Sequence, residues 1–236
     1  FYGFRYIKIE GLEGELRLED FEAIPICSGF DRIGEFSSSN PIINQLQHNI
    51  EWGFWGNFVD VPTDCPQRDE RLGWTGDAQV FFRTASFLGK VDNFFNKWLS
   101  DLKADQRHDG RVPRIIPDTY SNGDYRTAAT GWADASVIIP WNHYMAFGNV
   151  NILEQQYNSM KGWVDYMVSQ SKDRGWLWNN GSHYGDWLFY SLSNDPGGQS
   201  AVTSSHLVAQ CFFANSADLV SRTAKLLGKQ KDADDY

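Results

Sequence analysis

The sequence has few cysteines and no cluster of basic residues. Its three cysteines, Cys27, Cys65 and Cys211, lie far apart and are odd in number, which excludes a disulfide framework and a CxxC metal site. The 21 Lys and Arg residues are scattered and outnumbered by 30 Asp and Glu, so that the formal charge is -9. Because phosphate binding needs a positive field, we expect no nucleic-acid partner.

Long apolar runs are also missing. No stretch approaches the roughly 20 apolar residues of a membrane-spanning helix, and the opening FYGFRYIKIE has neither the basic nor the apolar region of a signal peptide. We therefore expect a soluble protein with no membrane partner, and the sequence does not decide between cytoplasm, periplasm and secretion. The chain does not begin with Met, and we expect it to be a piece of a longer protein.

Aromatic residues, in contrast, are abundant at 15% of the chain. Many recur at helical spacing and are expected in the core. Trp74, Trp132 and Trp187 instead lie beside Gly and Asp in predicted loops. A flat ring among hydrogen-bonding side chains suits the apolar face of a sugar, so these three indoles indicate a neutral carbohydrate ligand.

The periodicity of apolar residues divides the chain near residue 35. Residues 1–34 alternate in the manner of two or three short strands, which are not stable alone and are expected to complete a sheet that lies upstream. Residues 35–236 have the helical period, and the expected helices span about 40–55, 76–105, 132–147, the residues from 151 to about 167, and 200–227. The fold class is therefore predicted to be mainly α.

Local signals define several helix ends. Asn40 and Pro41 form an N-cap and first-turn proline, and Asn151 with Glu154 matches a capping box. Gly228 is expected to end the helix before it, and KQKDADDY to begin another. Helices that alternate with long polar loops and short turns predict a toroid of paired helices, in which the loops at one end hold a site.

The stretch PTDCPQRDERLGWTGDAQ, residues 62–79, gathers four carboxylates around an indole. Cleavage of a glycosidic bond needs one carboxylic acid to protonate the leaving oxygen and a second carboxylate at the anomeric carbon. Burial beside Trp74 and the proximity of Asp64 and Asp77 would keep Glu70 protonated, which makes Glu70 the candidate general acid. Asp64 and Asp77 are expected to be ionised hydrogen-bond acceptors, and Arg68 to balance their charge.

A purely structural interpretation of the same residues is also open. Asp64 would then be a turn residue, Asp77 a first-turn carboxylate favoured by the helix dipole, and Arg68 with Glu70 a solvated ion pair. The later segments GWAD and GDW place Trp132 and Trp187 beside Asp, where they suit either sugar stacking or closure of the helical core.

Neither a metal nor a cofactor is expected. His183 and His206 lack a partner at metal-ligand spacing and are interpreted as ordinary polar residues.

At these motifs the chain resembles the bacterial alpha-L-rhamnosidases of glycoside hydrolase family seventy-eight. DCPQRDERLGWTGDAQ resembles that family's signature. The other motifs occur along the chain in the family's order: GFRYIKIEG, GEFSSSNPIINQL, ATGWADA and YGDWL. The resemblance covers nearly the whole chain. It implies an inverting hydrolase of terminal alpha-L-rhamnose with an (alpha/alpha)6 barrel, here partial and truncated at its C-terminal side, preceded by strands of an upstream beta-sandwich domain.

The resemblance also implies residue roles. Glu70 matches the family's general acid, and further residues match the rhamnose subsite: Asp64, Arg68, Trp74, Asp77, Trp132 and Trp187. The family's general base is a Glu farther downstream. We therefore expect residues 1–236 to be inactive without the remainder of the protein, unless Asp134 or Asp186 serves as the base.

Two other functions remain open at this point. The chain can belong to another inverting (alpha/alpha)6 glycosidase, one that acts on glucosides or uronides. It can also be a helical carbohydrate-binding domain without catalysis. The predicted partner is a carbohydrate in every case. For the rhamnosidase that the resemblance implies, it is a rhamnose-containing oligosaccharide or glycoside.

Overall fold

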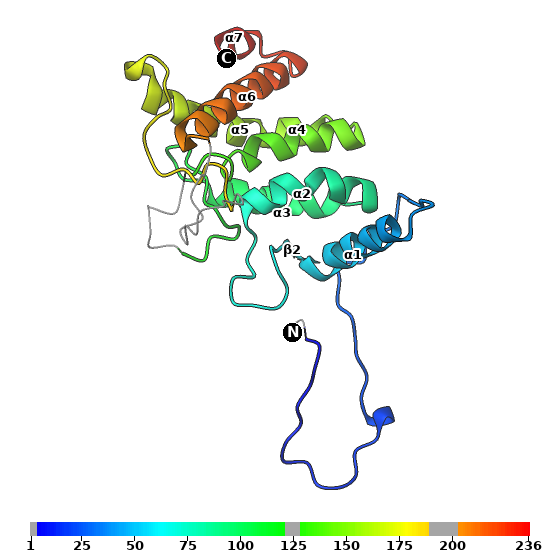
Figure 1. The fold of residues 1–236 in the computed structure, drawn as a ribbon. Helices are drawn as coiled ribbons and strands as arrows, with labels where there is room; N and C mark the ends of the chain where they lie inside the picture. Colours follow the sequence, from blue (N-terminus) through cyan, green and yellow to red (C-terminus); the bar gives the residue numbers. More distant parts are fainter. Residues whose placement is uncertain (1–3, 121–127, 189–202) are drawn as a thin grey trace.

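The computed structural model describes residues 4–120, 128–188 and 203–236, and it is mainly helical (Figure 1). The α-helices are α1 (Pro41–Asn57), α2 (Thr75–Leu88), α3 (Asp92–Asp105), α4 (Ala135–Phe147), α5 (Asn151–Ser171), α6 (Ser205–Leu226) and α7 (Gln230–Asp235). Two antiparallel two-residue strands, β1 (Phe58–Val59) and β2 (Val61–Pro62), follow α1, and the 3-10 helices are η1 (Leu18–Asp20) and η3 (Lys172–Arg174). The mainly α class predicted from the sequence is confirmed.

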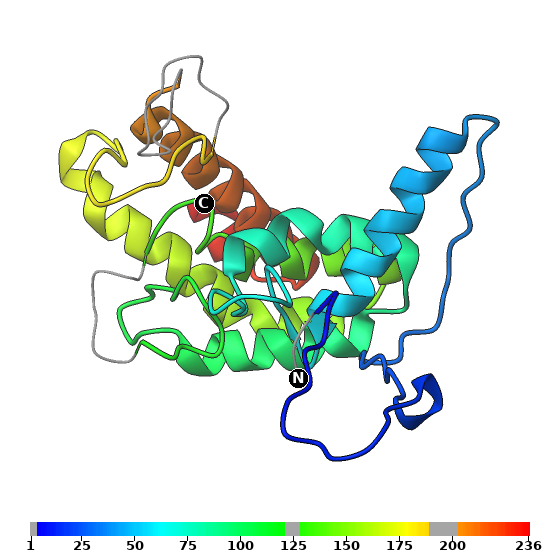
Figure 2. The same ribbon diagram turned by 60° about the horizontal axis from the view of Figure 1, so that its bottom comes forward.

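The helices form two layers. α2, α4 and α6 lie side by side and run in the same direction, and α3 and α5 pack behind them in the opposite direction (Figures 1 and 2). The described parts of the connections that lead into α2, α4 and α6 therefore meet at one end of the layer formed by these three helices. This end of the molecule contains the residues singled out in the sequence.

The start of α1 follows the local signal in the sequence. Asn40 has an extended backbone and its Oδ1 accepts a hydrogen bond from the Ile42 N–H at 2.9 Å, and Pro41 occupies the first turn. The amide oxygen thus satisfies one N–H that the first turn leaves free. The predicted N-cap is confirmed.

The single helix expected over about 76–105 is wrong, because the chain leaves the helical conformation between α2 and α3. Gly89 is extended, and a β-carbon on it would lie 3.1 Å from the Phe30 Cβ and 3.2 Å from the Phe54 ring. The next residue, Lys90, donates its N–H to the Asp31 carbonyl at 2.9 Å. Packing against the segment before α1 therefore ends α2, a long-range effect that apolar periodicity does not reveal.

The capping box expected at Asn151 and Glu154 is also absent. Val150 is already in the helical region, with φ -67 and ψ -23, so Asn151 lies inside the first turn and not at its cap. The Oδ1 of Asn149 accepts from the Asn151 N–H at 3.1 Å instead. At the other end of the chain, Gly228 with φ +70 follows α6 and α7 begins at Gln230, both as predicted.

The strands expected over residues 1–34 do not form in the described part of that segment. Residues 4–34 are largely exposed and contain η1 and one isolated bridge, between Arg32 and Gly89. A strand needs a neighbouring strand to pair its N–H and C=O groups. Among the described residues, backbone pairing of this segment with the rest of the chain is confined to a few bonds of residues 28–33. The apolar residues Tyr6 and Leu18 are each 87% exposed.

Aromatic side chains fill the core between the layers. Phe82, Phe95, Trp98 and Trp163 are fully buried, and the Phe82 and Phe95 rings meet edge to face at 4.7 Å. Burial of a large apolar side chain stabilises a fold by about 1.5–3 kcal/mol. The aromatic residues at helical spacing therefore hold the scaffold, as expected.

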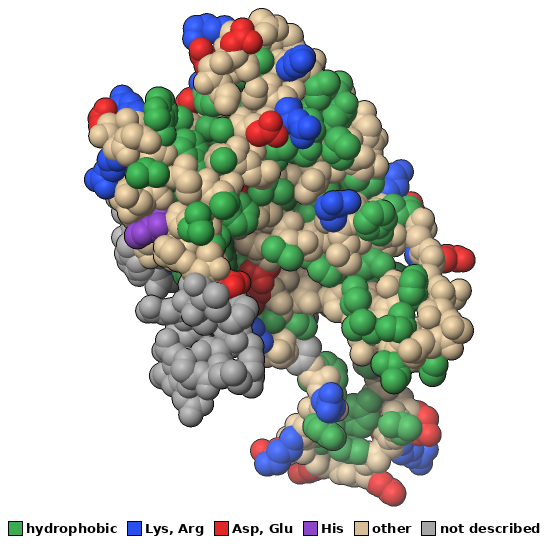
Figure 3. Space-filling model, turned by 45° about the horizontal axis from the view of Figure 1, so that its top comes forward, with side chains coloured by type: hydrophobic (Ala, Val, Ile, Leu, Met, Phe, Trp, Pro, Cys, Tyr) green, Lys and Arg blue, Asp and Glu red, His purple; other side chains and the backbone are tan. Residues whose placement is uncertain are grey.

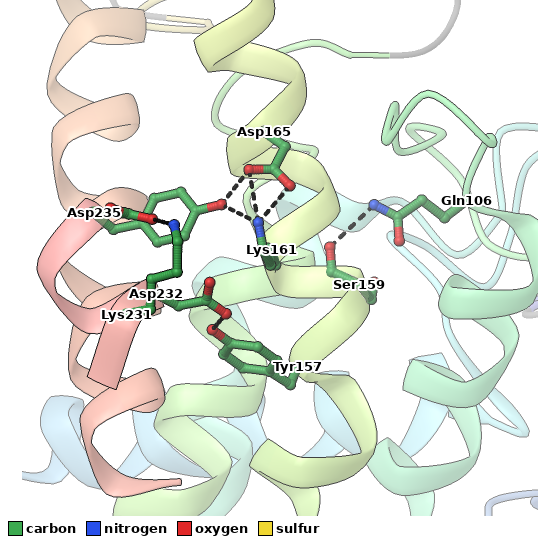
Figure 4. Close-up of polar contacts among 9 residues, drawn as sticks. Gln106, Tyr157, Ser159, Lys161, Asp165, Lys231, Asp232 and Asp235 are labelled. Carbon is green, nitrogen blue, oxygen red and sulfur yellow. Dashed lines mark hydrogen bonds and ion pairs between the residues drawn. The ribbon is translucent and has the colours of Figure 1, made fainter. Parts of the chain in front are cut away.

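Polar contacts attach α7 to the outer face of α5 (Figure 4). The Tyr157 hydroxyl donates to Asp232 Oδ2 at 2.6 Å, and Lys161 bridges Asp165 at 2.9 Å and the Tyr236 hydroxyl at 2.6 Å. Burial, together with the Asp232 carboxylate, raises the pKa of Tyr157 well above its usual value. The phenol therefore stays protonated and remains a donor at neutral pH.

The surface has no basic stripe on the face shown in Figure 3, where Lys and Arg side chains are dispersed among Asp and Glu. None of the helices in the described ranges is long and apolar enough to cross a membrane.

Candidate active site

The loop before α2 is closed around Asp64. The Asp64 N–H donates to the Leu72 carbonyl at 3.3 Å, and the Leu72 N–H donates to Asp64 Oδ1 at 3.3 Å. The side chain of Asp64 is only 7% exposed. Asp64 therefore shapes the turn and at the same time holds a carboxylate on the inner side of the loop.

Glu70 lies on the outer side of the same loop. Arg68 Nε contacts Glu70 Oε2 at 2.9 Å, and Arg68 Nη2 lies 3.6 Å from Asp64 Oδ2, so the guanidinium links the two carboxylates. The Trp74 indole N–H donates to the Glu70 carbonyl at 3.0 Å. The side chain of Glu70 is 55% exposed, so the burial expected from the neighbouring indole is wrong for this structure.

Asp77 projects from the first turn of α2. Desolvation raises the pKa of Asp77, and the Asp64 carboxylate and, more weakly, that of Glu70 raise it further. The residue as a whole is nevertheless exposed to solvent. Asp77, expected from the sequence to be an ionised acceptor, is thus a carboxyl whose pKa lies above its ordinary value.

Trp132 and Trp187 form an aromatic wall together with Tyr184. The Trp132 ring lies 4.3 Å from that of Tyr184 and 6.3 Å from that of Trp187, the latter at an interplanar angle of 88°. The Arg114 guanidinium lies over the Tyr184 ring at 4.9 Å. Trp187 is 47% exposed, so part of the wall faces solvent. Tyr184 was not predicted, although its place in HYGDW beside Trp187 is a usable signal.

A cavity of about 600 Å³ lies between the loop and this wall. Of the residues predicted from the sequence, Asp64, Asp77, Trp132 and Trp187 line it. Arg68, Glu70 and Trp74 belong to the adjacent loop. The volume is that of a small-molecule site, and carboxylates opposite indoles provide the hydrogen-bonding and stacking surfaces that a sugar needs.

Asp134 does not reach this cavity. It is 0% exposed, and it accepts hydrogen bonds from Trp163 Nε1 at 3.0 Å, from Ser216 Oγ at 2.6 Å and from the Gly131 N–H at 2.8 Å. Burial raises its pKa, and the three donors act against that shift. Because it is sealed from solvent and joins α4, α5 and α6, Asp134 is a structural acceptor and cannot activate a water molecule for a substrate.

His183 is held by two hydrogen bonds within the protein. His183 Nδ1 accepts from the Thr130 N–H at 3.3 Å and its Nε2 bonds to the Asn180 carbonyl at 2.9 Å, while burial lowers its pKa. Within the described ranges no group of three His, Cys, Asp or Glu side chains is arranged to hold a metal ion.

The chain is similar to known rhamnosidases. The alpha-L-rhamnosidase of Formosa agariphila is 40% identical in an alignment of 238 positions, gaps included, which covers 100% of this chain and 25% of that protein. The solved alpha-L-rhamnosidase of Aspergillus terreus matches with a TM-score of 0.80 and 39% identity over 89% of this chain and 24% of its own. The solved alpha-L-rhamnosidase of Streptomyces avermitilis, complexed with L-rhamnose, matches with a TM-score of 0.75 and 39% identity over 84% of this chain and 18% of its own.

The chain thus spans about a quarter of the length of the first of these relatives. The family model of the bacterial alpha-L-rhamnosidase six-hairpin glycosidase domain matches residues 31–236, which include every α-helix described above. With that match and the agreement in fold, the chain belongs to the bacterial alpha-L-rhamnosidase six-hairpin glycosidase family.

Proposed function

We propose that the protein containing this chain removes terminal alpha-L-rhamnose from rhamnosides, with inversion at the anomeric carbon. The observation that carries this proposal is the cavity lined by Asp64, Asp77, Trp132 and Trp187, in a chain of this family. The indoles would stack on the apolar face of the deoxyhexose, and Asp64 and Asp77 would bind its hydroxyls. Arg68 would keep the loop charges balanced.

Glu70 is the proposed general acid. It lies in the loop that contributes Asp64 to the cavity, and Arg68 links the two carboxylates; an aglycone seated over this loop would exclude water from Glu70. Exclusion of water favours the uncharged acid, the form that protonates a leaving oxygen. Arg68 would have to release Glu70 on substrate binding, and because the pair is more than half exposed, its separation costs little.

The general base is proposed to come from outside residues 1–236. Asp134 is excluded by its burial, and an inverting reaction needs a second carboxylate with room for a water molecule. We further infer that α2, α4 and α6 are inner helices of an (alpha/alpha)6 barrel, and that residues 1–34 form strands only against the sheet of a separate, upstream beta-sandwich domain.

The test is Glu70→Gln in the full-length protein, assayed on aryl rhamnosides with good and poor leaving groups. Loss of the acid should lower kcat by about 10²–10⁴-fold for the poor leaving group and much less for the good one, because only the former needs protonation. Asp69→Asn, the adjacent exposed carboxylate, is the matched control and should retain activity.

Equal loss on both substrates, or none, would remove Glu70 from the acid role. Cleavage of a glucoside or uronide but no rhamnoside would favour another inverting glycosidase. Sugar binding without any turnover would favour a non-catalytic binding domain. Residues 1–236 alone should show no turnover, and activity there would identify a base within this chain, with Asp186 the first to replace.

A further inference from the structure

The indole of Trp132 lies directly on the backbone of α2 at Gly76. A β-carbon on Gly76 would lie 2.7 Å from Cε2 and 2.8 Å from Nε1 of that indole. Carbon atoms do not approach so closely without a van der Waals clash. The position of Trp132 therefore requires a residue without a side chain at this point of the first turn of α2.

The residue before Trp132 is fixed at both of its backbone polar groups. The Gly131 carbonyl accepts from Gln79 Nε2 at 3.1 Å, and the Gly131 N–H donates to Asp134 Oδ2 at 2.8 Å. Gln79 is 7% exposed and lies three residues after Gly76, on the same face of α2. Gly131 itself has φ +87, which other residues rarely adopt. The backbone that leads into Trp132 is thus held in one conformation.

The remaining neighbours of the indole are the other members of the aromatic wall. Tyr184 contacts it at 4.3 Å between ring centroids, and Trp187 stands perpendicular to it. Neither is attached to α2 in sequence, and Trp187 is 47% exposed. Gly76 and Gln79 are therefore the contacts by which a rigid helix locates the wall relative to Asp77.

We propose that Gly76 is a positioning residue for the sugar-binding wall: by lacking a side chain it seats Trp132 on α2 at a fixed distance from the cavity carboxylates. This inference rests on the proposed function, because the contact of Trp132 with the sugar is part of it. Gly76 itself need not touch the substrate.

The first experiment compares Gly76→Ala with Gly56→Ala in the full-length protein. Gly56 lies in α1, outside the cavity lining, and a β-carbon there meets nothing within 4 Å. A methyl group at Gly76 should displace the indole and raise KM for an aryl rhamnoside and Kd for L-rhamnose by about tenfold, a loss comparable to one aromatic contact, while kcat changes less. The control should stay within about twofold of the wild type.

A double-mutant cycle separates positioning from other effects of the methyl group. In a Trp132→Ala background, Gly76→Ala should cost no more than about twofold, because no indole remains to be displaced. A full tenfold cost in that background would overturn the proposal. If Gly76→Ala alone fails to fold, the double variant has room for the methyl group and should fold, and failure of both would also overturn it.

A crystal structure of Gly76→Ala distinguishes this inference from the proposed function. An indole that stays in place refutes the positioning role, whatever the enzyme cleaves. If the indole is displaced but the wild-type protein cleaves no rhamnoside, the proposed function is refuted and the positioning role of Gly76 stands.

Discussion

Removal of the Asp134 carboxylate is expected to loosen three helices at once. In Asp134→Ala the Trp163 and Gly131 N–H groups lose their acceptor, while the Ser216 hydroxyl can rotate to another. Each N–H left unpaired away from water costs about 1–3 kcal/mol, so two of them cost about 2–6 kcal/mol. Ser216→Ala leaves the carboxylate with two donors and should cost only about 1 kcal/mol.

Hydrogen exchange measured by mass spectrometry on the full-length protein tests this locally. Amides of α4 and α5, next to the two N–H groups left unpaired, should exchange about 30-fold to 10⁴-fold faster in Asp134→Ala than in the wild type, and those in Ser216→Ala only a few-fold faster. Amides of α1, which contain none of these partners, serve as an internal reference. Equal, small changes in both variants would show that the carboxylate is not the hub of this network.

Two further predictions concern Asp77 and α7. The pKa of Asp77 is raised above its ordinary 3.8, so the contribution of this carboxyl to folding stability is complete below pH 3.8 and is lost as the pH rises through the raised pKa. Asp77→Asn should therefore flatten this part of the pH dependence of Tm. Parallel Tm curves for the variant and the wild type would contradict the prediction. Tyr157→Phe removes the bond to Asp232 and should speed exchange of the α7 amides about 3–10-fold while α2 is unchanged, whereas protected α7 amides would show that the contact is dispensable.

Features encoded by neighbouring residues were predictable. The Asn40 cap of α1, the Gly228 end of α6 and the short α7 each depend on a few adjacent residues. The break between α2 and α3 was not predictable, because it results from Phe30 and Asp31, which lie far from Gly89 in sequence. Strands in residues 1–34 depend on partners that alternation alone does not supply.

The composition of the site was predictable, and its exposure was not. The spacing of Asp64, Glu70 and Asp77 indicated paired carboxylates, but whether each is buried depends on how the loop closes through Leu72. Asp134 was open to interpretation as a base because its partners lie 29 and 82 residues away in the chain.

The parallel course of α2, α4 and α6 has a consequence for how such a protein can diversify. The residues that would recognise a ligand lie on connections entering these three helices or, for Asp77, in a first helical turn, whereas the helix contacts lie behind them. Insertions or exchanges in those connections can alter which glycoside is accepted without repacking Phe82, Phe95 or Trp98. Selectivity and scaffold stability are therefore separable traits, free to evolve at different rates.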